Sequence, residues 1–143
     1  MENEQEKPTT FFRFEDLRIY HKALEYTDLI YSVSHKVKDD PYTRYFFERF
    51  LTSATNIATN IAEGSSRNKS QFVYYLKMAK SSARECVVLS TLALSQKFIT
   101  AEVFDTSKNY LMEMTKMIGA LIGSLQRSVR PGEPGTDEED ETE

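Results

Sequence analysis

The chain has 143 residues, 40% of them hydrophobic, and a formal net charge of −4. This length suffices for one domain with a substantial core, and no apolar run is long enough to span a bilayer. The single cysteine, Cys86, excludes an internal disulfide and a zinc site built from cysteines. The polar segment 1–10 lacks the basic start and apolar centre of a secretory signal, so we expect a cytoplasmic protein.

The acidic residues are distributed unevenly along the chain. Seven of the 22 lie in residues 131–143, which contain no basic residue; they are Glu133, Asp137, Glu138, Glu139, Asp140, Glu141 and Glu143. The first 130 residues hold 18 basic and 15 acidic residues, a net charge of +3. A segment this acidic and rich in Pro-Gly pairs cannot bury apolar surface. We therefore predict a disordered acidic tail over 131–143, a folded domain over 14–130 and a flexible segment over 1–13.

The first helix is predicted from about residue 16 to residue 38. Two apolar stripes at helical spacing lie about 100° apart on it. One stripe comprises Leu17, Tyr20, Leu24, Thr27, Tyr31 and Ser34, and the other comprises Ile19, Ala23, Tyr26, Ile30 and Val37. Asp40 is the predicted N-cap of a second helix that has Pro41 at its first position. That helix is expected to end at residue 62 or 63, with Gly64 as a C-cap glycine.

The third helix is predicted over about 71–95, with Ser70 as its N-cap after a polar loop over 65–69. Thr100 is the predicted N-cap of a fourth helix that runs to about residue 128. We see no strand-like alternation between these segments. Short loops between long amphipathic helices favour antiparallel neighbours. The expected fold is therefore all-α, an antiparallel up-and-down four-helix bundle.

Three of these helices carry more apolar surface than one core requires. Val88, Leu89 and Leu92 are predicted to point away from the core face of the third helix. Gly119 and Gly123 are predicted opposite the core face of the fourth, where their spacing permits close approach of another backbone. Scattered exposed apolar residues are also normal on a monomer. Together with the second stripe of the first helix, these residues favour a homo-oligomer with closed symmetry.

No catalytic or metal-binding constellation is apparent in the sequence. The only histidines, His21 and His35, are 14 residues apart, and neither belongs to a Glu-x-x-His pair. There is no phosphate-binding glycine loop, nucleophile elbow or dinucleotide fingerprint. Cys86 adjoins Glu85 and is interpreted as a packed residue rather than a thiolate. We predict that the protein is not an enzyme and holds no metal or cofactor.

Two polar features remain for function. The first is a basic track that begins in the loop after the second helix and continues along one side of the third helix. It comprises Arg67 and Lys69 in the loop and Lys77, Lys80 and Arg84 on the helix. Such a track suits a phosphate backbone, although an ordinary solvated face gives the same pattern. The acidic tail is a hypothetical competitor for it.

The second feature is a structural corner formed by Asn60, Glu63 and Gly64. The helix dipole disfavours an anion at a C-terminus, so Glu63 needs a compensating partner, for which Arg67 and the first amides of the third helix are candidates. A ligand site at this corner is the alternative.

Several of these residues resemble a known family. The opening run Phe14-Glu15-Asp16-Leu17-Arg18-Ile19-Tyr20-His21-Lys22-Ala23, the run Asn60-Ile61-Ala62-Glu63-Gly64 followed by Arg67, and the residues Leu76, Ala79, Ser82 and Glu85 are similar to the family of 23S rRNA intervening-sequence proteins, also labelled S23 ribosomal protein. Leu51 and Thr52 stand where that family often has two arginines.

The resemblance implies a four-helix bundle that assembles as a pentameric ring. It also implies kinship with the accessory proteins of diversity-generating retroelements, which bind nucleic acid and a partner reverse transcriptase. We therefore expect a nucleic-acid-associated accessory protein that binds itself and RNA or DNA, with no membrane partner. The alternative is a protein-interaction scaffold without a nucleic-acid role.

Overall fold

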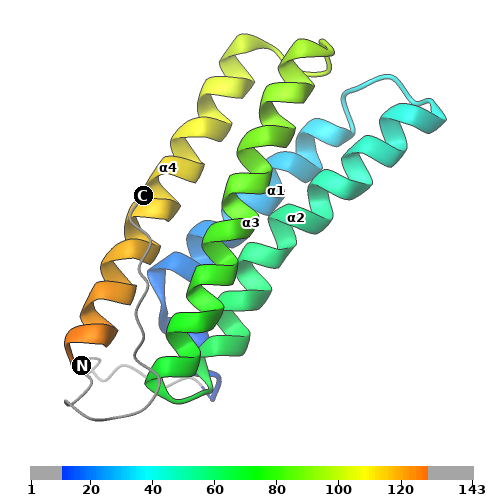
Figure 1. Cartoon of the computed structure of the whole chain (residues 1–143). Helices are drawn as coiled ribbons and strands as arrows, with labels where there is room; N and C mark the ends of the chain where they lie inside the picture. Colours follow the sequence, from blue (N-terminus) through cyan, green and yellow to red (C-terminus); the bar gives the residue numbers. More distant parts are fainter. Residues whose placement is uncertain (1–10, 129–143) are drawn as a thin grey trace, which may run out of the picture.

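The computed structural model describes residues 11–128, which form four long helices that run alternately up and down (Figure 1). A short 3-10 helix, η1 (Arg13–Asp16), precedes α1 (Arg18–Ser34), α2 (Pro41–Ser65), α3 (Lys69–Ser95) and α4 (Ala101–Arg127). No strand occurs in this part of the chain. The all-α four-helix prediction is confirmed. The predicted tail 131–143 lies outside the described residues, as do residues 1–10 of the predicted N-terminal segment.

Side-chain caps fix where the last three helices begin. Asp40 Oδ1 accepts a hydrogen bond from the Thr43 amide at 2.9 Å, and Thr100 Oγ1 accepts one from the Val103 amide at 3.1 Å, as predicted. The prediction for α3 was wrong. Its N-cap is Asn68, whose Oδ1 accepts from the Gln71 amide at 2.9 Å, rather than Ser70. Asparagine caps as well as serine does, and it stands two residues earlier, so the loop is shorter than expected.

Helix α1 is shorter than predicted at both ends. Leu17 is extended, with φ −88° and ψ 127°, and separates α1 from η1. At the other end, the carbonyl of Tyr31 lies 2.6 Å from the Ser34 hydroxyl and 3.0 Å from His35 Nδ1. These side chains compete for a carbonyl in the last turn of α1, which ends at Ser34 instead of residue 38.

The stripe of α1 that we treated as surplus is the one that faces the core. Ile19, Ala23, Tyr26 and Ile30 are buried, whereas Leu24 and Tyr31 of the other stripe are 38% and 56% exposed. The core that they join takes apolar residues from the other three helices: Phe46, Phe47, Phe50, Ile57 and Ile61 of α2, Leu76, Ala79 and Ala83 of α3, and Leu111, Met114 and Ile118 of α4. The apolar surplus of α1 therefore lies on the Leu24 side.

Three buried hydroxyl groups link α1, α3 and α4 inside this core. Ser107 Oγ lies 2.7 Å from the Tyr26 hydroxyl and 2.6 Å from Ser90 Oγ. All three groups are satisfied by one another, as buried polar groups require. Burial raises the pKa of Tyr26 above its ordinary value, so the phenol remains a neutral hydrogen-bonding group.

Candidate nucleic-acid interface

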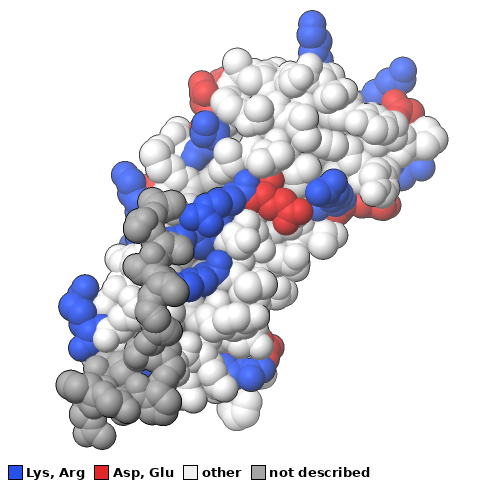
Figure 2. All heavy atoms as spheres, in the orientation of Figure 1, with Lys and Arg blue, Asp and Glu red and all other residues white. Residues whose placement is uncertain are grey.

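The predicted basic residues of α3 share one side of that helix. With 100° per residue, Lys77, Lys80 and Arg84 lie within about 60° of one another, and Lys69 lies on the same side at the start of the helix. Lys77 and Lys80 are half-buried, since their methylene stems lie along the bundle, while Lys69 and Arg84 are exposed. Figure 2 shows basic side chains gathered across the middle of the face on which α3 and α4 lie in front.

The other long edge of α3 faces α2 and has a different electrostatic character. There Glu85 pairs with Arg49 of α2 at 3.6 Å. No carboxylate within residues 11–128 pairs with Lys69, Lys77 or Lys80. Unneutralised cations along one edge create a positive potential that attracts an anionic chain. We call Lys69, Lys77, Lys80 and Arg84 the α3 basic edge.

Arg67 does not continue this edge, because it is engaged at the α2–α3 corner. Its guanidinium donates to Glu63 Oε2 and lies over the ring of Tyr75, 5.1 Å from the ring centroid. This hydrogen bond to the Glu63 carboxylate raises the pKa of Arg67 above its ordinary value. The geometry thus brings Glu63 and Arg67 together as predicted. The first amides of α3 are served by the Asn68 cap instead.

Gly64 is not a C-cap, which corrects the prediction. It lies inside α2 and is buried, and helix α2 continues to Ser65. A Cβ atom built on Gly64 is only 2.6 Å from Tyr75 Cβ and 3.0 Å from Phe72 Cδ1. Glycine is therefore required here because α3 approaches closely. Asn60, the third predicted corner residue, donates to the carbonyl of Asn56 at 2.9 Å and does not reach across the corner.

The residues predicted for an oligomer interface fall into two groups. Val88 and Leu92 are 57% and 42% exposed, and nothing lies within 4 Å of a Cβ built on Gly119. A Cβ on Gly123 meets only the Arg127 guanidinium, at 3.2 Å. The placement of Leu89 was wrong. At 3% exposure it belongs to the core of its own subunit, because it lies one turn after buried Cys86 on the side of α3 that faces α2.

Cys86 is packed in the core, as predicted from its position. Burial, and after it the neighbouring Glu85 carboxylate, raises the pKa of the thiol to about 12. The thiol is therefore protonated at neutral pH and is not a nucleophile. Over residues 11–128 there is no group of three His, Cys, Asp or Glu side chains placed to hold a metal ion. None of the helices in that range is long and apolar enough to cross a membrane.

Comparison with known proteins shows the family of this chain. The family model described as 23S rRNA-intervening sequence protein matches residues 15–120. The chain belongs to this family. A solved structure, described as a protein with unknown function from the S23 ribosomal protein family from Bacteroides thetaiotaomicron VPI-5482, is similar with a TM-score of 0.65 and 23% identity, covering 73% of this chain and 97% of that chain. A comparison with curated proteins returned no match.

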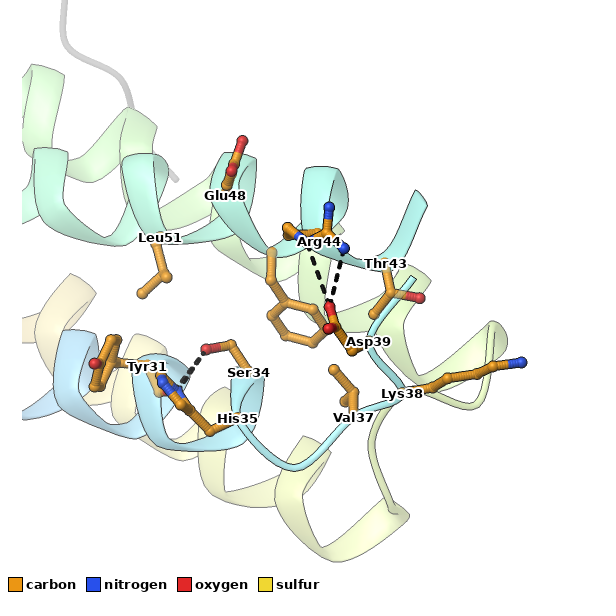
Figure 3. A pocket seen from close by; sticks show the side chains of 11 residues that line it. Tyr31, Ser34, His35, Val37, Lys38, Asp39, Thr43, Arg44, Glu48 and Leu51 are labelled. Carbon is orange, nitrogen blue, oxygen red and sulfur yellow. Dashed lines mark hydrogen bonds and ion pairs between the residues drawn. The ribbon is translucent and has the colours of Figure 1, made fainter. Parts of the chain in front are cut away.

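This member of the 23S rRNA-intervening sequence protein family also has a pocket that the sequence did not indicate. It lies where α1 turns into α2 (Figure 3), has a volume of about 470 Å³, and its apolar lining includes Val37, Phe47 and Leu51. Arg44 donates from Nε and Nη2 to Asp39 Oδ1 at 3.3 and 3.1 Å, so the central charges neutralise each other. Lys38 points away from the pocket. The Asp-Asp-Pro turn was the available signal, but we interpreted it only as a helix boundary.

Proposed function

We propose that this member of the 23S rRNA-intervening sequence protein family is a non-enzymatic accessory protein that self-associates and binds RNA or DNA through the α3 basic edge. The observation that carries the proposal is that Lys69, Lys77 and Lys80 lie on one side of one helix without a carboxylate partner in residues 11–128. Lysines arranged in this way contact successive phosphates and release the counterions condensed on them.

Self-association strengthens such a surface. Copies related by a closed symmetry repeat the edge around an axis, and their fields add. Exposed Val88 and Leu92 and the open Gly119 supply apolar and close-packing surface for that contact. A pentameric ring, and a partner protein such as the reverse transcriptase of a diversity-generating retroelement, belong to the same proposal on the strength of the family resemblance.

A salt titration with a matched pair of variants tests the nucleic-acid part. Fluorescence anisotropy of a labelled single-stranded RNA and DNA is measured with the parent chain, Lys77→Gln/Lys80→Gln and Lys36→Gln/Lys38→Gln. Both variants remove two positive charges, but Lys36 and Lys38 lie in the segment between α1 and α2 and not on α3. We expect only the α3 variant to weaken binding, and to make the slope of log affinity against log salt shallower by roughly 1–2. Equal weakening by the two pairs contradicts the proposed edge.

A protein-interaction scaffold is the second candidate function, and one observation favours it. Tyr42 and Tyr45 of α2 and Leu92 of α3 surround a small hollow of about 160 Å³ and are 58%, 65% and 42% exposed. Exposed aromatic and aliphatic side chains around a hollow are typical of protein contacts. If the protein is an interaction scaffold of this kind, neither RNA nor DNA binds the unsubstituted protein at low salt.

A further inference from the structure

We propose that the acidic segment 131–143 of this chain binds the α3 basic edge of its own subunit and thereby competes with nucleic acid. This inference concerns regulation of the same surface and rests on the proposed function for its consequence, although the docking itself does not. The proposed ligand of the edge is the segment that follows α4 in the same chain.

The position at which α4 ends favours this contact. Helices α3 and α4 are antiparallel, so the end of α4 and the start of α3 lie at the same end of the bundle (Figure 1). The chain therefore leaves α4 after Arg127 at the end where Lys69 begins the basic edge. A segment that follows α4 therefore begins at the end of the bundle that holds the first cation of the edge.

The segment after α4 is also long enough to follow the edge. From Lys69 to Arg84 the edge advances 15 residues along a helix, which at 1.5 Å per residue is about 22 Å. The 15 residues after Ser128 span up to about 50 Å when extended. The segment is thus long enough to run along the whole edge, with residues to spare for the turn at the end of α4.

The charges of the segment and of the edge are complementary. Residues 131–143 contain seven carboxylates and no cation. The edge offers the unneutralised Lys69, Lys77 and Lys80 in addition to Arg84. The opposite edge of α3 is a poorer target, because Glu85 is acidic and Arg49 is already paired with it. Opposite charges held on one chain meet at high effective concentration, which favours an intramolecular contact over one with a separate molecule.

Occupation of the edge has a functional consequence. An anionic segment and a phosphate backbone cannot contact the same lysines at once, so the bound segment lowers the apparent affinity for nucleic acid. The effect selects ligands, since a long or densely charged strand displaces the segment and a short one does not. It also weakens as salt screens both contacts.

Cross-linking tests the docking without nucleic acid. A zero-length carbodiimide, which joins a carboxylate directly to an amine, is applied to an equal mixture of ¹⁴N- and ¹⁵N-labelled full chain at low salt. Mass spectrometry is expected to find residues 131–143 joined to Lys69, Lys77 or Lys80 with both peptides carrying the same label. The links are expected to disappear in the Lys77→Gln/Lys80→Gln variant apart from those to Lys69, and to persist in Lys36→Gln/Lys38→Gln. Absence of these links overturns the proposal. So does a mixed-label fraction of about one half, which random pairing of separate chains in an equal mixture gives.

RNA binding tests the competition. Two chains are compared with the full protein, one ending at Arg130 and one of full length in which the seven tail carboxylates are replaced by their amides. Both are expected to bind RNA more tightly at low salt, by about fivefold to about 150-fold, the usual range for coupled sites. Equal affinities for all three overturn the competition. If none of the three binds RNA or DNA while the cross-links form, the docking stands and the proposed function fails.

Discussion

The two long edges of α3 differ in how closely they are packed and in whether their charged groups are paired. On the α2 side, the helices approach so closely that Gly64 cannot carry a Cβ, and the charged groups are paired, Arg49 with Glu85 and Arg67 with Glu63. On the α4 side, Gly119 faces open space and the lysines of the α3 basic edge have no carboxylate partner in residues 11–128. One edge therefore stabilises the bundle, and the other is available to a ligand.

Replacement of Gly64 and, separately, of Gly119 by alanine tests the difference between the two edges with the largest expected effects on stability. Gly64→Ala is expected to lower the free energy of unfolding by about 1–3 kcal/mol, because the new methyl group overlaps Tyr75 Cβ, which cannot move without the α3 backbone. Urea unfolding followed by far-UV circular dichroism measures the loss. Unchanged stability would mean that α2 and α3 separate easily and that the close contact is not a constraint.

Gly119→Ala is expected to act in the opposite direction. Alanine favours a helix interior over glycine by about 1 kcal/mol, and the added methyl group meets nothing within 4 Å in the subunit. The gain is measured by urea unfolding at a concentration where the chain sediments as a single subunit. Sedimentation at higher concentration then tests the proposed interface, since a backbone packed against Gly119 makes the variant assemble more weakly.

Glu63→Gln probes the paired charges at the α2–α3 corner. The Glu63–Arg67 pair is solvent-exposed, with side chains 53% and 37% accessible, and exposed pairs contribute little. We expect a loss of thermal stability smaller than the change at either glycine, and one that disappears at high salt. The control is Glu48→Gln, an exposed α2 carboxylate for which the structure gives no ion pair with Arg67. An equal loss in the control contradicts a stabilising role for the Glu63–Arg67 pair at this corner.

Lys77→Gln/Lys80→Gln is expected to have the smallest effect on stability. Because no carboxylate in residues 11–128 pairs with these lysines, their replacement changes the free energy of unfolding by no more than about 0.5 kcal/mol. Thermal and urea unfolding check this, with Arg49→Gln as the comparison on the paired edge. A large loss would show that the lysine stems hold α3 and α4 together and that the edge is structural.

The elements predicted correctly are those decided within a few residues. Asp40 and Thr100 cap the amides three positions away, so local sequence suffices to identify them. The side of α3 that carries Lys77 and Lys80 follows equally from helical spacing.

The misplaced residues depend on contacts between helices. Helical spacing shows that α1 has two apolar stripes and that Leu89 is near a core face, but not which face meets another helix. Gly64 was misread because a C-cap and a close helix contact both call for a missing Cβ, and only the position of Tyr75 distinguishes them. The Glu85–Arg49 pair, which makes the two edges of α3 different, joins residues 36 positions apart and has no local signal.

The chain of hydroxyls from Tyr26 through Ser107 to Ser90 has a consequence for how the bundle selects one alignment. Helices with apolar faces built from alternating large and small residues pack acceptably at several longitudinal offsets. A shift of any of these three helices by one turn, about 5.4 Å, leaves buried hydroxyl groups without hydrogen-bond partners. Each unsatisfied group destabilises the shifted packing by about 1–3 kcal/mol. The three hydroxyl groups therefore favour one longitudinal alignment of the helices over the neighbouring ones. Hydrophobic contact alone, which has no preferred direction, does not make this distinction.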